Sequence, residues 1–229
     1  MDTGALTAKL KGFIFDQGAD LVGIAPVDRF AQAPEGHRPE DYLPGARSVV
    51  VIAIRLLDSI IDALPESRPR YTEHFFATNT ELNICANRTA RFLVKQGFSS
   101  APIYYSGGEV RIPYPAPFFD EMSFRHAAVE AGLGRIGKNQ LFITPQFGPR
   151  VRLIIVLTQA ELHPDEKIEE ELCQPEKCGY RCLVNCFPGA LKRDGTIDKP
   201  ACAKYMFETL NYLRCGMCVA SCPIPLDSS

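Results

Sequence analysis

The chain has 229 residues, which suits one domain or one domain with a small appended module, since single hydrophobic cores rarely grow beyond about 250 residues. Hydrophobic residues make up 46% of the chain and charged residues 23%, proportions that exclude a disordered or fibrous protein. The net charge of -2 gives no electrostatic footprint for nucleic acid. Cysteine is the unusual component: there are nine, and all except Cys85 lie between Cys173 and Cys222.

The N-terminal segment carries no recognisable targeting signal. Residues 1–20 lack a basic start followed by an apolar run and a cleavage site, so we expect a cytoplasmic protein whose cysteines stay reduced. No stretch approaches the roughly 18 uninterrupted apolar residues of a membrane span. The sequence therefore predicts no association with a membrane.

Helical and strand patterns alternate along the first 159 residues. The run 47–56, RSVVVIAIRL, has a continuous β-branched character that predicts a strand buried on both faces, as in the middle of an α/β sheet. In chain order the patterns predict a helix at 3–17, strands at 21–27 and 47–56, a helix at 80–96, a strand at 101–106, a helix at 123–134, and strands at 140–145 and 151–159.

The segments between these elements also carry information. Residues 33–44 predict a surface loop, and residues 107–122 form a long loop rich in glycine and proline, of the kind that often carries function. The last two predicted strands are expected to pair across a turn at 147–149. The charged run 165–171 separates this part from the cysteine-rich end and is expected to be a solvated face.

The eight clustered cysteines form two groups, each ending in a Cys-x3-Cys step with a proline close behind it. The first group is Cys173, Cys178, Cys182 and Cys186, and the second is Cys202, Cys215, Cys218 and Cys222. This ending is typical of bacterial ferredoxins with two clusters, in which the last cysteine of each group binds the other cluster. The spacing thus predicts one [4Fe-4S] cluster on Cys173, Cys178, Cys182 and Cys222, and another on Cys186, Cys202, Cys215 and Cys218.

Two structural zinc sites are the alternative reading of the same cysteines. Zinc prefers the same thiolate ligands, but its sites usually pair two Cys-x2-Cys steps, and only Cys215 and Cys218 have that spacing. Cys173 has the least regular spacing of the eight, and the first cluster would have an open iron without it. Cys85 lies at a core position of its predicted helix and is expected to be a buried apolar thiol.

Residues 131–139, AGLGRIGKN, match both the dinucleotide fingerprint and most of the phosphate-loop pattern. Both patterns require a strand before the glycines and a helix after them, whereas here a helix precedes and a strand follows. Asn139 also stands where the phosphate loop has its Ser or Thr. A nucleotide site is therefore disfavoured.

The segment from Ser123 to Pro223, including AGLGRIGKN, CGYRCLVNCFPGAL and CGMCVASCP, resembles the epoxyqueuosine reductases, which are related to corrinoid-dependent reductive dehalogenases. The resemblance implies a nitroreductase-like α/β sandwich domain at residues 1–165 and a ferredoxin-like module with two [4Fe-4S] clusters at residues 166–229. It also implies a cobalamin bound without a histidine ligand. In agreement, no Asp-x-His-x-x-Gly motif is present. FMN in the first domain is the alternative cofactor.

By the same resemblance, the glycine motif would line the cofactor pocket. Its residues are Gly132, Gly134, Arg135, Ile136, Gly137, Lys138 and Asn139. The expectation is that glycines there let the backbone approach a large flat macrocycle.

A reductase also needs a proton source. Where family members have a proton-donating acid this chain has Phe118, so the nearest acids, Asp120 and Glu121, are candidates beside His126 and Tyr105. Each has a plain structural alternative: a helix-packing histidine, a loop-packing tyrosine, or acids that start a helix.

The predicted activity is reduction of a small substrate, with electrons from a low-potential donor such as ferredoxin or flavodoxin. Family members continue into a helical repeat domain that binds tRNA, whereas this sequence ends seven residues after Cys222, so tRNA is not expected as substrate. The alternative is an electron-transfer or corrinoid-reducing accessory protein without a substrate of its own. The sequence does not decide between a monomer and a homodimer.

Overall fold

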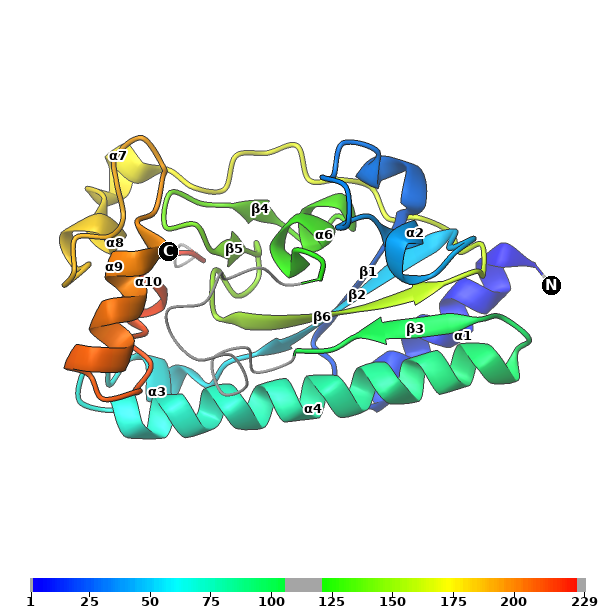
Figure 1. Cartoon of the computed structure of the whole chain (residues 1–229), viewed down its shortest axis with the longest axis horizontal. Coiled ribbons are helices and arrows are strands. Elements are labelled where there is room, and N and C mark those ends of the chain that lie inside the picture. The colour runs from blue at the N-terminus through cyan, green and yellow to red at the C-terminus, as the bar shows by residue number, and fades with distance from the viewer. Residues whose placement is uncertain (1, 106–120, 226–229) are drawn as a thin grey trace.

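The computed structural model describes residues 2–105 and 121–225, and it is built around a four-stranded sheet. Helices flank this sheet (Figure 1). The strands lie in the order β1 (Leu21–Pro26), β2 (Ser48–Arg55), β6 (Val151–Thr158) and β3 (Ser100–Ile103). Every neighbouring pair is antiparallel, as in Val50 opposite Val156. The fold therefore mixes helices and strands as predicted, but its sheet is not the parallel sheet of an α/β protein.

Strand β2 lies between β1 and β6, and its residues Ser48–Ala53 are all buried. The prediction of a strand covered on both faces is thus confirmed. Such burial suits the apolar sequence because no position of the strand has to face water.

Helices α1 (Thr3–Asp16) and α4 (Arg68–Lys95) cover one face of the sheet. Leu10 and Ile14 of α1 and Leu82 of α4 pack there against Ile52 and Val156. Cys85 lies in the same cluster with 2% exposure, and burial raises the pKa of its thiol, which confirms that it is a core residue.

The opposite face is covered by shorter elements. These are η1 (Val27–Phe30), α2 (Pro39–Tyr42) and α6 (Phe124–Glu130), and Ala127 and Ala128 of α6 pack against Val51 and Ile155 of the sheet. Helix α6 begins as predicted after Ser123, whose hydroxyl accepts a hydrogen bond from the backbone N–H of His126.

Helix α4 is much longer than predicted, beginning at Arg68 instead of residue 80. The extra turns bury Tyr71 and Phe75 together with three polar residues, Thr72, Thr78 and Asn79. Asn79 donates to the carbonyl of Phe75 and accepts from Arg152. Hydrogen bonding of this kind lets polar residues occupy the buried face of a helix.

The predicted pairing of the strand at 140–145 with the strand at 151–159 is wrong. β5 (Phe142–Ile143) instead pairs with β4 (Arg135–Ile136), which lies inside the glycine motif, while β6 joins the large sheet. The glycine motif therefore leads from α6 into a small β-hairpin.

The cysteine-rich end consists of short elements gathered at one end of the molecule, beside α3 (Asp58–Ile61) and the start of α4 (Figure 1). They are α7 (Pro175–Cys178), α8 (Arg181–Val184), α9 (Lys199–Lys204), the π-helical turn η2 (Tyr205–Thr209) and α10 (Met217–Ala220). Within residues 2–105 and 121–225, no helix is both long enough and apolar enough to cross a membrane.

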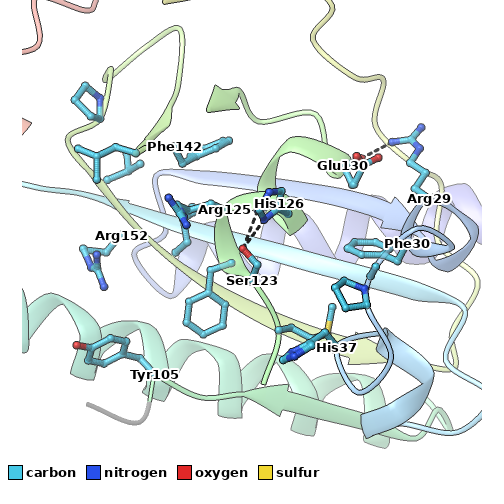
Figure 2. A pocket seen from close by; sticks show the side chains of 18 of the residues that line it. Arg29, Phe30, His37, Tyr105, Ser123, Arg125, His126, Glu130, Phe142 and Arg152 are labelled. Carbon is cyan, nitrogen blue, oxygen red and sulfur yellow. Dashed lines mark hydrogen bonds between the residues drawn. The ribbon is translucent and has the colours of Figure 1, made fainter. Parts of the chain in front are cut away.

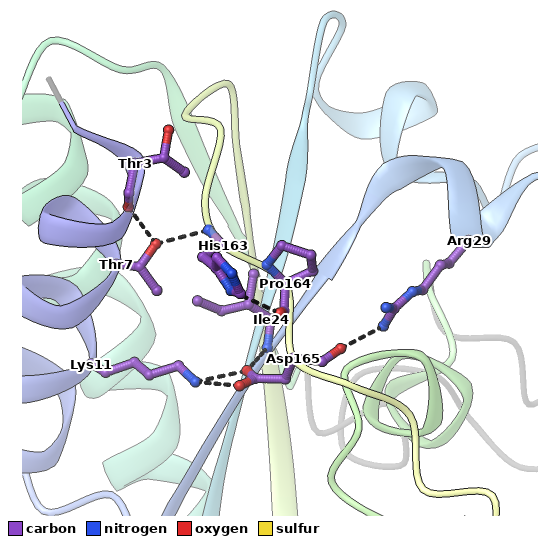
Figure 3. A network of polar contacts seen from close by, with 8 residues as sticks. All are labelled: Thr3, Thr7, Lys11, Ile24, Arg29, His163, Pro164 and Asp165. Atoms are coloured by element: carbon purple, nitrogen blue, oxygen red, sulfur yellow. Dashed lines mark hydrogen bonds and ion pairs between the residues drawn. The ribbon is translucent and has the colours of Figure 1, made fainter.

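The charged run that precedes these elements begins with a docked residue, not a solvated one. Figure 3 shows Asp165 accepting hydrogen bonds from Lys11 at 2.6 Å and from the backbone N–H of Ile24 at 2.8 Å. Arg29 donates to the Asp165 carbonyl at 2.9 Å, and Lys167 pairs with Glu130 at 2.8 Å. These bonds tie the start of the charged run to α1, β1, η1 and α6.

Candidate functional site

The structure brings the cysteines together in the two interleaved groups that their spacing predicts. The first comprises Cys173, Cys178, Cys182 and Cys222, which line a cavity of about 180 Å³. Burial raises the pKa of Cys222 to about 11, and the neighbouring Cys182, Cys173 and Cys178 raise it further. Cys173, whose spacing is least regular, therefore lies with the other three.

The second group comprises Cys186, Cys202, Cys215 and Cys218. Burial raises the pKa of Cys218 to about 12 and that of Cys202 to about 11, and in both cases Cys215 and Cys186 add to the effect. Negative charge on these sulfurs is therefore disfavoured unless cations balance it, as bound metal would do.

Four thiols around a cavity suit a cluster better than a single ion. A zinc ion would draw its sulfurs to about 2.3 Å from one point. Within the described ranges, no three His, Cys, Asp or Glu side chains converge closely enough to hold one metal ion. In a [4Fe-4S] cluster each thiolate binds a different iron, so the sulfurs remain farther apart. The residues present thus fit a cluster.

A second, larger cavity of about 740 Å³ lies between the sheet, α6 and the start of α4 (Figure 2). Phe30, Tyr105 and Phe142 supply aromatic walls, and Arg125 and Arg152 supply positive charge. The volume lies in the upper part of the range typical of cofactor sites, about 300–1,000 Å³. The cavity is therefore large enough for a bulky cofactor and favours ligands with anionic or electron-rich groups.

The candidates for proton transfer are not equally placed. His126 borders the large cavity, with its Nδ1 2.7 Å from the Ser123 hydroxyl. Desolvation lowers the pKa of His126, and Arg125 lowers it further against the opposing effect of Glu130. The neutral imidazole is therefore favoured near pH 7, which makes His126 a weak proton donor there.

Tyr105 also borders the large cavity, packing edge-on against Phe75 with ring centroids 5.8 Å apart. Glu121 is exposed, and its backbone carbonyl accepts a hydrogen bond from Tyr42 at 2.8 Å. Asp120 lies outside the described residues. The structure thus brings His126 and Tyr105, but not the Glu121 carboxylate, to the cavity wall.

The glycine motif lies elsewhere than expected. Among the described residues, none of its seven members borders the large cavity, while Lys138 and Asn139 border the cavity of the first cysteine group. The backbone N–H of Lys138 donates to the Cys173 sulfur at 3.4 Å. The hairpin therefore separates the two cavities, since Leu141 and Phe142 face the large one.

The glycines themselves make room for the protein's own backbone. A Cβ at Gly132 would overlap the carbonyl oxygen of Glu166, and a Cβ at Gly134 would overlap that of Ile143. Gly132 also has a φ of +73°, which disfavours other residues. Their glycine character follows from this close packing, so a macrocycle is not required to explain it.

Tyr71 is a site residue that sequence reasoning missed. It is buried on α4 and borders the large cavity, and burial followed by the Cys218 sulfur raises its pKa. Val219, next to Cys218, borders the same cavity. The second cysteine group therefore lies beside the large cavity, with Tyr71 and Val219 between them. The helical spacing of Tyr71, Phe75 and Leu82 is the sequence pattern that could have placed Tyr71 on the buried face of this helix.

No protein-family model matches the chain. A tetrachloroethene reductive dehalogenase from Desulfitobacterium hafniense is 38% identical over 224 residues, which cover 90% of this chain and 36% of that protein. An epoxyqueuosine reductase from Bacillus anthracis is 31% identical over 118 residues, which cover 45% of this chain and 30% of that protein. The chain thus spans about a third of the length of these relatives.

Solved structures show the same fold. The catabolic reductive dehalogenase NpRdhA in complex with 3-bromo-4-hydroxybenzoic acid superposes with a TM-score of 0.74 at 20% identity, over 97% of this chain and 32% of that one. An epoxyqueuosine reductase bound to a modified tRNA stem loop superposes with a TM-score of 0.68 at 22% identity, over 96% of this chain and 65% of that one. The chain is thus similar in sequence and fold to the epoxyqueuosine reductases and reductive dehalogenases.

Proposed function

We propose that this chain is an iron–sulfur oxidoreductase whose eight clustered cysteines hold two [4Fe-4S] clusters and whose large cavity holds a cobalamin at which a small substrate is reduced. The observation that carries this proposal is the position of the second cysteine group beside the large cavity, separated from it by Tyr71 and Val219. A group that donates single electrons and a pocket for a bulky acceptor are thus adjacent.

The relatives support the choice of cofactor. One of the solved reductive dehalogenases is described as suggesting a mechanism for B12-dependent dehalogenation. Nothing in the relatives' names supports FMN, the alternative cofactor. Cobalamin would supply a cobalt centre that can be reduced one electron at a time. The arginines and aromatic side chains around the cavity would bind and orient this cofactor and its substrate.

The proposal also covers the partners and the division of the chain. We expect a small substrate and a low-potential electron donor such as ferredoxin or flavodoxin. We expect residues 1–165 to bind the cofactor and residues 166–229 to hold the clusters. One solved relative binds a tRNA stem loop, so the expectation that tRNA is not the substrate stays a prediction.

An accessory role is the second candidate, favoured by the lowered pKa of His126 and the exposed position of Glu121. Without a proton-donating side chain at the cavity, a protein of this kind would reduce a corrinoid or pass electrons to another protein. It would not protonate a product. Reduced protein that reoxidises only when a second protein is added would support this role. Turnover of a small molecule by the isolated chain would exclude it.

The test is metal and sulfide analysis of anaerobically purified protein, with visible and EPR spectra before and after cobalamin is added. We expect about eight irons and eight sulfides per chain, as two [4Fe-4S] clusters require, and a changed cob(II)alamin EPR spectrum. Zinc without sulfide would refute the cluster assignment. An unchanged cob(II)alamin spectrum with intact clusters would refute the assignment of the large cavity.

A further inference from the structure

Arg68, the first residue of α4, lies against the second cysteine group. The charge of its guanidinium opposes the rise that burial causes in the pKa of the Cys215 thiol. The same guanidinium stacks over the ring of Phe187 at 5.3 Å from the centroid, and Phe187 directly follows Cys186. Arg68 thus lies near Cys215 and contacts the neighbour of Cys186.

Two nitrogens of this guanidinium lack acceptors. Nε and Nη2 of Arg68 are buried, and neither has a hydrogen-bond partner within the described part of the chain. Buried guanidinium N–H groups are normally paired, because leaving them unpaired carries a large desolvation cost. Cluster sulfides and thiolates accept hydrogen bonds, so a cluster held by the second group would supply the missing acceptors.

A second buried cation lies close by. Arg214 is 8% exposed, precedes Cys215, and lowers the pKa of Cys202 against the effect of burial. The positive end of the α4 dipole lies at Arg68 as well. Two arginines that are buried or partly buried thus lie near the second group, where charge interactions are stronger than in open solvent.

The first group has a different environment. Lys177 and Arg181 border its cavity but are exposed, so solvent screens their charges. Around Cys173 the charge of Lys138 is opposed by that of Glu171. A strong unscreened cation is thus a feature that distinguishes the second group.

We propose that Arg68 is a positioning residue for the second cluster: it donates hydrogen bonds to the cluster from Nε and Nη2 and raises that cluster's reduction potential without affecting the first. The physical reason is that the reduced cluster carries one more negative charge than the oxidised cluster, and a nearby cation stabilises the reduced form. The inference rests on the proposed function, since it requires that clusters bind.

The experiment is an EPR-monitored redox titration of the anaerobically purified full chain, comparing Arg68→Met, Arg68→Lys and Arg70→Met. Arg68→Met should move one of the two midpoint potentials to a more negative value and leave the other unchanged. Arg68→Lys keeps the charge but loses the Nε and Nη2 donors, so its shift should be smaller. Arg70 is exposed on the same helix, and its replacement should change neither potential.

Two further variants assign the shift to a cluster. The shift caused by Arg68→Met should persist when Cys178→Ser removes the first cluster and disappear when Cys218→Ser removes the second. If Arg68→Met itself loses a cluster, the titration of Arg68→Lys takes its place, and a smaller negative shift of one midpoint alone is the expected result. Unchanged midpoints with full iron content, or equal shifts of both midpoints, would overturn the role of Arg68. Wild-type protein without iron and sulfide would instead refute the proposed function.

Discussion

The ring of Tyr71 lies against Gly216 so closely that a Cβ at position 216 would be 2.7 Å from Cε1 of Tyr71. Tyr71 belongs to α4 and borders the large cavity, whereas Gly216 lies between Cys215 and the helix that carries Cys218. This contact joins the cavity wall directly to the second cysteine group. Any side chain at position 216 would push the two apart.

Gly216→Ala is expected to lower both thermal stability and iron content. Its φ of +69° costs a non-glycine residue about 1–2 kcal/mol, and the clash with Tyr71 adds about 1–3 kcal/mol. Gly189→Ala is the matched control, because Gly189 has a φ of +59° but nothing within 4 Å of an added Cβ. Thermal unfolding and iron analysis of both variants provide the measurement. Equal losses would show that the Tyr71 contact is unimportant.

Gly134→Ala should destabilise the protein even when no cofactor is present. The added Cβ would overlap the Ile143 carbonyl and force β4 and β5 apart, for which we expect a loss of about 1–3 kcal/mol in the free energy of unfolding. Gly12→Ala is the opposite case. Gly12 lies exposed inside α1 with open space around it, so alanine there should raise the free energy of unfolding by about 0.5–1 kcal/mol. Denaturant unfolding of the two metal-free variants measures both effects. If Gly134→Ala were as stable as the wild-type protein, close packing would not explain why position 134 is a glycine.

The interleaved cysteine groups can be tested with paired substitutions. Cys178→Ser combined with Cys222→Ser removes two residues of one group and should cost about four irons per chain. Cys178→Ser combined with Cys218→Ser affects both groups and should cost about eight irons. Cys85→Ser, in the core, should cost none. Iron and sulfide analysis separates these outcomes. Equal losses of about eight irons in the two double variants would mean that each run of cysteines binds its own cluster.

The pKa of His126 should respond in opposite directions to changes of its two charged neighbours. Arg125→Gln should raise this pKa toward about 6.5, the ordinary value, and Glu130→Gln should lower it further. NMR titration of the histidine C–H resonances measures both. Shifts of the same sign would contradict the electrostatic cause.

The same lowered pKa has a consequence for stability. Because the unfolded chain binds the His126 proton more tightly than the folded protein does, the contribution of His126 to stability is complete above about pH 6.5. It decreases as the pH falls from there toward the folded pKa. Replacing His126 with Gln should remove this part of the pH dependence. The free energy of unfolding, measured from about pH 5 to about pH 7, checks this expectation.

The sequence predicted most elements correctly where apolar residues follow a regular period, as in α1 and β2. It placed the start of α4 at residue 80 because the preceding turns bury Thr72, Thr78 and Asn79, which look like surface residues until Arg152 and the Phe75 carbonyl are seen to bond Asn79. It also paired the strand at 140–145 with the wrong partner, since a local pattern does not identify the strand that lies opposite.

The sequence by itself predicted the two interleaved groups of cysteines, because residue type and spacing are local properties of the chain. Only the tertiary structure decided that the second cysteine group, through Tyr71 and Val219, lies beside the large cavity. It likewise decided that Gly132 and Gly134 accommodate the protein's own carbonyl groups. These relationships join residues far apart in the chain, so they depend on how helices and strands pack and leave no periodic trace in the sequence.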